Sequence, residues 1–413
     1  MAEAGRRESF AALRRPAFRN YFICATFAAT GDSVEHVASY WVLFKQFNSP
    51  TLGGVAVLTH WLPFLLFSVY AGALADRFDP RRLLQVSQNL MMLVSLGWAL
   101  LLLTGTLNES FAVMMLVFHG LFGVFALPAM QLMVHELVEP EHLQSAVRIN
   151  ASTRQLGLLL GPALGGTLML VLSPMWTLIL NMACYLPIVI WASRARRSKP
   201  YVKPQRGPSA SGFREIFKTV RMVAKNRTII SMIALVGGAS LFIGNAYQPQ
   251  MPEFAHDLHH EHGADAGVFY NLLLSADAVG AISAVLILEG RGLLNAHPRT
   301  AMILTMCWCL ALGGFAAATS YWIAIPLMFA AGFFSLSFNA MAQTLVQMRA
   351  PPEARGRIMG LFGAASMGLR AFSGVTIGVL GGLIGIHWSL AASALALLTV
   401  AVVLLALSVR PAR

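Results

Sequence analysis

Charged residues are scarce in this sequence. Asp, Glu, Lys and Arg make up 12% of the 413 residues, whereas hydrophobic residues make up 57%. Soluble domains carry roughly 25% charged residues. With a mean hydropathy of +0.65, the composition excludes an ordinary water-soluble globular protein. We therefore expect a polytopic membrane protein.

Cysteines and enzyme motifs are also rare. The four cysteines, Cys24, Cys184, Cys307 and Cys309, lie in apolar runs without CxxC spacing, so we expect neither a disulfide framework nor a zinc site. The sequence lacks a phosphate-binding loop, an HExxH motif and a GxSxG motif. We expect that the chain is not an enzyme and uses no cofactor.

Long apolar runs recur along the whole chain. A run of about 20 residues crosses a hydrocarbon core of about 30 Å as a helix. The sequence therefore predicts an all-α membrane protein with twelve spans, centred near Ala29, Leu65, Leu96, Phe125, Leu159, Met182, Ala239, Ala276, Cys309, Gly332, Met367 and Leu397.

The positive charges are placed asymmetrically. If the amino terminus is inside, all of the 30 Lys and Arg residues except Lys45, Arg154 and Arg370 fall in the tails or in cytoplasmic connections. This distribution follows the positive-inside rule. We expect cytosolic termini and no cleavable signal. Because topology and anionic lipid account for the net charge of +12, we expect no nucleic-acid partner.

A basic segment divides the chain into two halves. Residues 194–227 hold 11 Lys or Arg together with several Pro and Gly. We interpret 1–17 as a cytosolic tail, 18–193 and 228–409 as two pseudo-symmetric six-helix bundles, and 194–227 as the linker. A faint repeat at an offset of 212 residues, which matches Pro140 with Pro352, favours an internal duplication.

The connection between the second and third spans carries GALADRFDPRRLL, residues 72–84. Its glycine permits close helix packing, and its Asp can pair with Arg near a helix start. The segment resembles the G-x-L-x-D-R-x-G-R-R signature of the major facilitator superfamily, with Asp79-Pro80 where the family has Gly-Arg. The resemblance implies a conformational gate, formed by Gly72, Asp76, Arg77, Arg81 and Arg82.

The fifth span carries GLLLGPALGG, residues 157–166. It resembles the G-x-x-x-G-P-x-x-G-G pattern of drug:proton antiporters of the same superfamily, at Gly157, Gly161, Pro162, Gly165 and Gly166. Small residues four apart let helices approach closely, and proline bends a helix. Tight packing without any bearing on transport direction is the alternative interpretation of this motif.

Together with the NYF...GD...SP..LG pattern of the first span, these motifs make the chain resemble an antiporter subgroup that contains macrolide efflux pumps and enterobactin-type siderophore exporters. The resemblance implies a multi-pass protein of the bacterial inner membrane that exports a small amphipathic organic compound in exchange for protons, by alternating access. The expected partners are this small molecule, protons and the lipid bilayer, and we expect a monomer.

Ionisable residues interrupt the first span in the stretch GDSVEHVASY. Asp32, Glu35 and His36 have i, i+3, i+4 spacing and share one helix face. Asp32 lies about 21 Å along the helix from Phe18, and a charge at the bilayer centre costs at least about 2.5–3.5 kcal/mol. We therefore expect this face to line a cavity.

Our hypothesis is that Asp32 and Glu35 carry protons and that His36 modulates them. Asp277 in the eighth span is the next candidate for coupling, and Arg154 and Arg370 are candidate counter-ions. The structural alternative is that Asp32 only supports the fold while Glu35 and His36 hydrogen-bond each other.

Two other functions stay open. Asp32 and His36 also resemble the first-helix metal site of ferroportin-type iron exporters, and a carboxylate with an imidazole suits divalent metals. A lysophospholipid flippase of the same fold is the other alternative. The outward loop 253–267, with His256, His259, His260 and His262, either gathers metal or forms a solvated cap.

The substrate path should be lined by polar and aromatic residues of the spans that face the cavity. The candidates are His60, His119, Asn245, Tyr247, Gln248, Tyr270, Asn271, Asn339 and Gln343.

Overall fold

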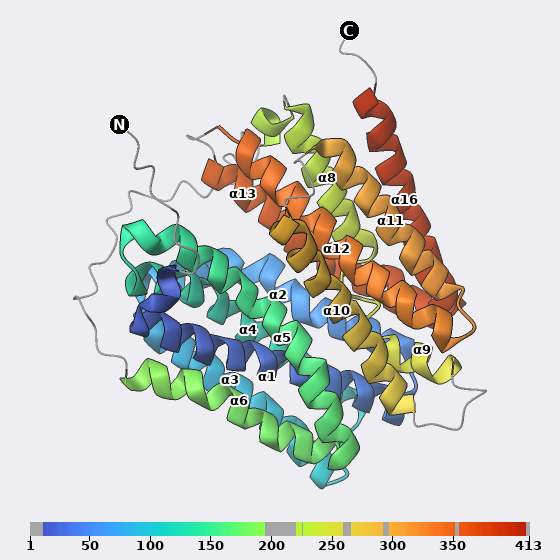
Figure 1. Cartoon of the computed structure of the whole chain (residues 1–413). Helices are drawn as coiled ribbons and strands as arrows, with labels where there is room; N and C mark the ends of the chain where they lie inside the picture. Colours follow the sequence, from blue (N-terminus) through green and yellow to red (C-terminus); the bar gives the residue numbers. More distant parts are fainter. Residues whose placement is uncertain are drawn as a thin grey trace. The chain divides into compact units, whose positions relative to one another are not determined.

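The computed structural model describes residues 11–194, 220–224, 226–258, 266–291, 297–351 and 355–409. The elements assigned within these ranges are helical (Figure 1). In chain order they are η1 (Ala11–Arg14), α1 (Pro16–Phe47), α2 (Pro50–Arg77), α3 (Pro80–Leu103), α4 (Glu109–Leu137), η2 (Pro140–His142), α5 (Leu143–Val171), α6 (Pro174–Arg194), α8 (Arg227–Phe242), α9 (Met251–Asp257), α10 (Ala266–Arg291), α11 (Pro298–Ala316), α12 (Tyr321–Arg349), α13 (Arg355–Gly363), η4 (Ala364–Gly368), α14 (Arg370–Ser373), η5 (Gly374–Val379), α15 (Leu380–Ile384) and α16 (Ile386–Val409).

The membrane-spanning character follows from length and composition. Within the described residues, nine helices are long and apolar enough to cross a membrane, and shorter apolar helices lie at Leu156–Val171 and Arg227–Phe242. Helix α1 has 32 residues, more than the about 20 that a crossing needs, although its ionisable residues lower its hydropathy. These helices confirm the predicted all-α membrane fold and agree with twelve spans.

The described residues cluster into two compact units. The first lies within Met1–Ala38, Phe67–Leu107 and Phe118–Pro204, and the second within Ser39–Leu66, Asn108–Val117 and Gln205–Arg413. Helices α1, α2 and α4 therefore contribute residues to both units. The predicted linker falls largely outside the described residues.

In the first unit, α3 packs along α6, which also contacts α5 (Figure 1). Tyr21 of α1 is buried in the core of this unit, where its hydroxyl donates to the Met130 carbonyl at 3.1 Å and its ring centroid lies 5.2 Å from that of Trp191. Buried aromatic area with a satisfied hydroxyl fixes α1 against α4 and α6.

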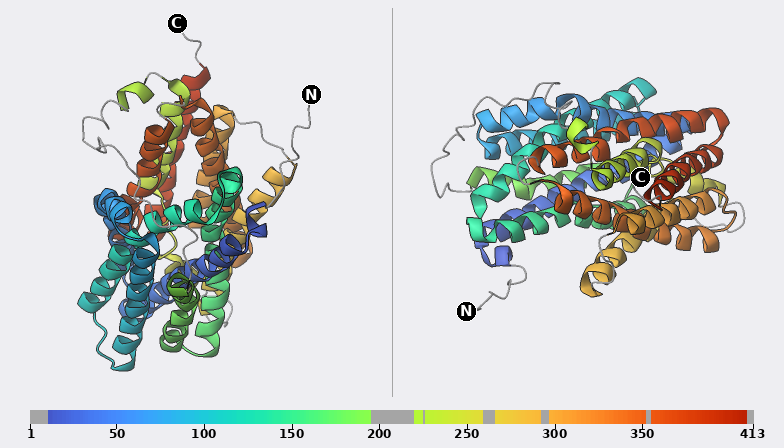
Figure 2. Two further views of the ribbon diagram at one scale, coloured as in Figure 1. Left: turned by 90° about the vertical axis from the view of Figure 1, so that its left-hand side faces the viewer. Right: turned by 90° about the horizontal axis from the view of Figure 1, so that it is seen from above.

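In the second unit, α12 packs against both α10 and α11, and α11 packs against α16. Figure 2 shows the orange α11 and α12 and the red α16 near one another in both of its views. A Cβ atom on Gly332 of α12 would overlap the Asp277 carbonyl of α10. Glycine at this position therefore lets two backbones touch beside an ionisable residue.

A second backbone contact in this unit joins α2 to η5. A Cβ atom on Gly54 would lie 2.8 Å from the Cα atom of Gly378 and would overlap the Gly374 carbonyl. The buried amide of Gln250 donates to the Pro50 carbonyl at 2.9 Å beside this contact.

Two spans of the second unit are interrupted. Helix α8 ends at Phe242, and turns that include Gly244, at φ +50°, lead to α9. Glycine adopts this left-handed conformation without strain. The span from α13 to α15 contains two π-helical segments, η4 and η5, which flank the four-residue helix α14. π-Helical insertions in α-helices occur frequently at functional sites.

The short helix α9 is tied to its neighbours by polar contacts. Oδ2 of Asp257 lies 3.1 Å from Nε2 of His387, whose Nδ1 lies 2.6 Å from the Ala316 carbonyl. The Tyr321 hydroxyl donates to the Ala255 carbonyl. These contacts connect α9 to α11, α12 and α16.

Candidate functional site

Asp32, Glu35 and His36, the ionisable residues of the first span, lie in the middle of α1 and belong to the first unit. Gly31, which precedes it, faces α6 closely, because a Cβ atom there would lie 2.9 Å from Cβ of Cys184 and 3.2 Å from Oδ1 of Asn181. Glycine thus allows α1 to approach α6 one residue before Asp32.

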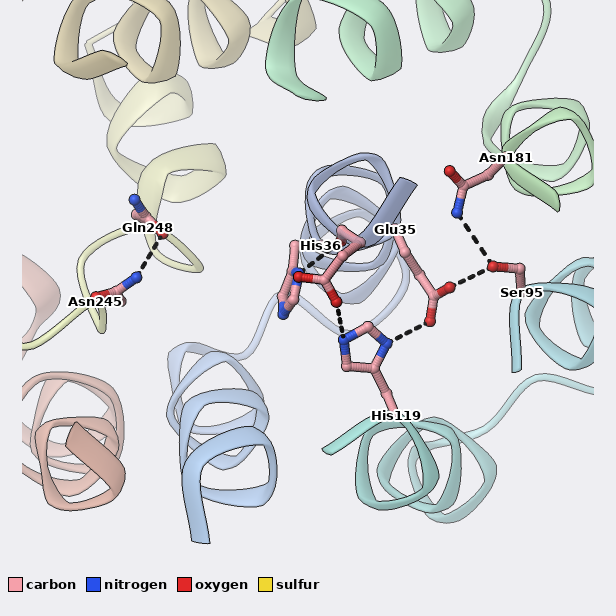
Figure 3. A network of polar contacts seen from close by, with 8 residues as sticks. Glu35, His36, Ser95, His119, Asn181, Asn245 and Gln248 are labelled. Carbon is pink, nitrogen blue, oxygen red and sulfur yellow. Dashed lines mark hydrogen bonds and ion pairs between the residues drawn. The ribbon is translucent and has the colours of Figure 1, made fainter. Parts of the chain in front are cut away.

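His119 of α4 lies between the two carboxylates of α1. Its Nδ1 atom is 2.7 Å from Oε1 of Glu35 (Figure 3). Its Nε2 atom is 3.1 Å from Oδ1 of Asp32. A neutral imidazole has one N–H donor, and ionised carboxylates only accept. The Nδ1 contact with Glu35 is a hydrogen bond, and the Nε2 contact with Asp32 is an ion pair when His119 is protonated.

The other carboxylate oxygen of Glu35 is bound by a serine, which is itself bound by an asparagine. Ser95 of α3 donates its hydroxyl to Oε2 of Glu35, and Asn181 of α6 donates its amide to Oγ of Ser95 at 3.2 Å (Figure 3). The sequence reasoning missed both residues, because a lone Ser or Asn in an apolar span gives no spacing signal.

Exposure distinguishes the two carboxylates. The side chain of Glu35 is 2% exposed, that of His119 is 6% exposed, and that of Asp32 is 44% exposed. The arrangement therefore runs from an accessible carboxylate through a buried imidazole to a buried carboxylate. Such a row can pass a proton over short distances, because each group can accept or release one.

The contacts of His36 differ from those expected if Glu35 and His36 hydrogen-bonded each other. Its Nδ1 atom lies 2.7 Å from the backbone carbonyl of Asp32 and 3.8 Å from Oδ2 of the same residue. Its ring stands edge-on to that of His119, with centroids 4.7 Å apart. Glu35 instead contacts His119 and Ser95, so the postulated Glu35–His36 hydrogen bond is replaced by these two contacts.

The glycines of the fifth span lie against α1. A Cβ atom on Gly157 would lie 2.6 Å from the Ala29 carbonyl oxygen, and one on Gly161 would overlap the Ser33 side chain. Gly165 is less tight, with 3.4 Å to Val34. Pro162 and Gly166 are buried in the same helix. The glycines of this motif thus form the surface of α5 against which the ionisable stretch of α1 packs.

Arg154 lies one turn before this motif on α5. Its side chain is exposed, and its guanidinium interacts electrostatically with Asp32. Arg154 and Asp32 carry opposite charges within one unit, as expected of a counter-ion pair. The role of Arg154 as a counter-ion stays a prediction.

The predicted gate segment is described in part. Helix α2, which contains Gly72, ends at Arg77, and the side chains of Asp76 and Arg77 lie outside the described part of the chain. Asp79 caps α3 by accepting from the Arg81 amide at 3.1 Å, with Pro80 at the first helical position. These are favoured residues for a helix start.

The two following arginines of the gate segment differ in exposure. Arg81 is buried, with Nη2 at 3.7 Å from Oε2 of Glu136, whereas Arg82 is exposed. The contact with Glu136 joins the start of α3 to the end of α4 within the first unit.

The second unit contains its own polar network. Nη1 of Arg370 donates to Oδ1 of Asn245 at 2.7 Å, and the Asn245 amide donates to Oε1 of Gln248 at 3.4 Å. The hydroxyl of Tyr247 donates to Asp277 at 3.2 Å. Figure 3 shows the Asn245–Gln248 pair. Five polar residues predicted for the second half, Asn245, Tyr247, Gln248, Asp277 and Arg370, are therefore brought together near the end of the interrupted α8.

The remaining substrate-path candidates are dispersed in the second unit. His60 contacts the rings of Trp61 and Phe64, and buried Tyr270 stacks on Trp41 at 5.7 Å. Asn271 and Asn339 donate to backbone carbonyls one turn earlier, and Gln343 is exposed. His259, His260 and His262 lie outside the described residues.

The chain matches the family model described as transmembrane secretion effector over residues 7–413. It is 25% identical over 398 residues to the enterobactin exporter EntS of Shigella boydii serotype 4 (strain Sb227), covering 94% of this chain and 91% of that protein. It is 24% identical, with the same coverage, to the enterobactin exporter EntS of Escherichia coli O139:H28 (strain E24377A / ETEC).

Solved structures share the fold at low identity. A POT family transporter in complex with 5-aminolevulinic acid has a TM-score of 0.72 at 12% identity, over 95% of this chain and 96% of that chain. An inward-facing bacterial homolog of the human lysosomal transporter Spinster has a TM-score of 0.69 at 13% identity, over 96% and 97%. The chain is therefore a multi-pass membrane transporter that belongs to the transmembrane secretion effector family, within the major facilitator superfamily.

Proposed function

We propose that this protein exports a small amphipathic organic compound from the bacterial cytoplasm in exchange for protons. The observation that carries the proposal is the row formed by Asp32, His119 and Glu35 in the middle of two membrane-spanning helices. Ionisable groups at that depth are costly and usually serve transport. Export as the direction is supported by the family and by the enterobactin exporters that the chain resembles.

In this proposal, Asp32 exchanges protons with water because its side chain is 44% exposed. His119 relays the proton to Glu35, which Ser95 holds in place. Protonation changes the charge of the row and hence the electrostatic attraction toward Arg154. The halves 18–193 and 228–409 then alternate between inward and outward access, with both termini in the cytosol.

Proteoliposomes test the function directly. The purified protein is reconstituted, an acidic lumen is imposed, and uptake of enterobactin is measured with and without nigericin, which collapses the pH gradient. Antiport predicts accumulation in the lumen that nigericin abolishes. Accumulation that is indifferent to the pH gradient would contradict proton coupling.

The same vesicles separate the alternatives. Fe²⁺ uptake and lysophospholipid translocation are measured under identical gradients, with a macrolide as a second organic compound. Transport of the cation alone would favour the metal function that Asp32 and His36 suggest. Translocation of lysophospholipid alone would favour a flippase.

A further inference from the structure

The second unit holds a cation where two interrupted spans meet. Arg370 lies on α14 between two π-helical segments, and Asn245 lies in the turns after α8. Irregular backbone at membrane depth is tolerated where it is buried in protein or lines a water-filled cavity, and interrupted helices form binding sites in transporters. The Arg370–Asn245 contact joins two such interruptions.

The guanidinium of Arg370 is held in a defined orientation. Its Nε atom donates to the Ser366 carbonyl at 2.9 Å, and Nη1 donates to Asn245 at 2.7 Å. Its central carbon lies 5.1 Å from the ring centroid of Trp61. A guanidinium that lies over an aromatic ring and donates to two oxygen acceptors has a defined orientation, which suits the recognition of a planar anion.

An aromatic surface adjoins this cation. The rings of His60, Trp61 and Phe64 contact one another with centroids 4.8–5.7 Å apart, and His60 and Phe64 are only half-buried. Arg370 and Asn245 are also half-buried. A forked cation beside partly accessible rings suits a ligand that combines a planar oxyanion with an aromatic ring, because each part meets its preferred partner.

We propose that Arg370, positioned by Asn245 and Trp61, binds a carboxylate or phenolate carried on an aromatic ring. This assignment rests on the proposed export function and narrows its substrate class to aromatic anions. Arg370 is then a ligand-binding residue, and Asn245 and Trp61 orient it.

A charge series on one ring tests the assignment. The thermal midpoint of the purified protein in detergent is measured with benzoate, benzamide, benzamidine and cyclohexanecarboxylate at equal concentrations. A ligand of the folded state raises the midpoint. We expect a concentration-dependent rise with benzoate that exceeds the rise with each of the other three compounds. Equal shifts with benzoate and benzamide would overturn the anion requirement, and equal shifts with benzoate and cyclohexanecarboxylate would overturn the aromatic one.

Variants locate the site. Arg370→Gln should abolish the benzoate shift, Arg370→Lys should weaken it, and Trp61→Leu should weaken it more than Trp61→Phe. The matched controls are the exposed Arg349→Gln and Trp322→Leu, which should keep the full shift. If Arg370→Gln does not fold, Arg370→Lys and the two Trp61 variants locate the benzoate site instead. A full benzoate shift in the folded Arg370 variants would overturn the proposal.

This binding assay needs no proton gradient, so its outcome is independent of the antiport test. Loss of benzoate selectivity with intact proton-driven export would overturn the ligand class alone. Benzoate-selective binding without proton-driven export would overturn the antiport function alone.

Discussion

Nδ1 of His119 lies 2.7 Å from Oε1 of Glu35, although the two residues are 84 positions apart in the chain. The first lies on α4 and the second on α1, and both side chains are almost fully buried. An imidazole in contact with a buried carboxylate ties the proton occupancy of one group to that of the other. The two residues should therefore act as one proton-binding unit.

Replacing either partner should uncouple transport from the pH gradient. Glu35→Gln removes the buried carboxylate and His119→Gln removes the imidazole, so each variant lacks one of the two groups that share the proton. We expect gradient-driven uptake in proteoliposomes to fall on the order of 5- to 150-fold, which is the change in affinity that typical coupling free energies between two sites produce. Substrate exchange without a gradient should persist.

The control for this experiment is His297→Asn. His297 caps α11 at an exposed position, and Asn is a favourable cap, so coupling should be retained. Full gradient dependence in Glu35→Gln and His119→Gln would remove these residues from the proton path.

Adding a methyl group to the α5 glycines should destabilise the protein where α1 is closest. Gly157→Ala and Gly161→Ala would collide with the Ala29 carbonyl and with Ser33. Overpacking costs about 1–3 kcal/mol, whereas Ala gains only roughly 0.5–1 kcal/mol over Gly in a helix. The net loss should lower the free energy of unfolding, measured by chemical denaturation in detergent.

Gly165→Ala serves as the matched control, because its added methyl group would meet Val34 at 3.4 Å, an ordinary contact. Its stability should equal or slightly exceed that of the parent. Equal stability of all three variants would contradict the close α1–α5 approach.

Asp79 should contribute to stability through the start of α3. Its side chain accepts from the Arg81 amide at 3.1 Å, and loss of such a cap costs about 1 kcal/mol. Asp79→Ala should lower the unfolding free energy by this amount, whereas Asp79→Asn, which keeps the acceptor, should change it little. A destabilised Asn variant would indicate that the charge, and not the cap, matters.

Glu253 should make the protein less stable at high pH. Burial, together with the neighbouring Asp257, raises the pKa of Glu253 on α9 to about 7. The folded state thus holds this proton more tightly than the unfolded state, so stability falls as pH rises from about 4.5 toward and beyond 7. Glu253→Gln should reduce the decline of the thermal midpoint between pH 5 and pH 8.

Other groups near α9 titrate as well. Asp257 faces His256 and His387, and the hydrogen bond with His387 lowers the pKa of Asp257. The stability that Asp257 contributes is lost only in acid below this window. The informative quantity is therefore the difference between parent and Glu253→Gln at each pH. Parallel pH profiles would refute the prediction.

The sequence predicted the spans well, because runs of apolar residues in a bilayer leave few alternatives to helices. It also located the ionisable stretch, since Asp32, Glu35 and His36 stand out against apolar neighbours. The sequence assigned His119 to the substrate path and not to the proton-binding group. Its contact with Glu35 depends on how α1 and α4 pack, which the sequence does not show. Ser95 was missed because a lone Ser in an apolar span gives no spacing signal, and its contact with Glu35 depends on how α1 and α3 pack.

The glycine motif was recognisable from its spacing, but the helix that it faces was not. Only packing shows that Gly157 and Gly161 lie against α1. The interruption at Gly244 was likewise not predicted, because a single glycine in an apolar span is common and its φ of +50° depends on the tertiary contacts around it.

The contact of Gly54 with Gly374 and Gly378 bears on the side-chain conformational entropy of helix movements in this transporter. Where two backbones meet without side chains between them, neither helix has rotamers to restrict on approach or to release on separation. Parting of α2 from η5 would thus leave the rotamer freedom of these positions unchanged. The free energy of such a step would come from hydration of the backbone and from the bond between Gln250 and the Pro50 carbonyl.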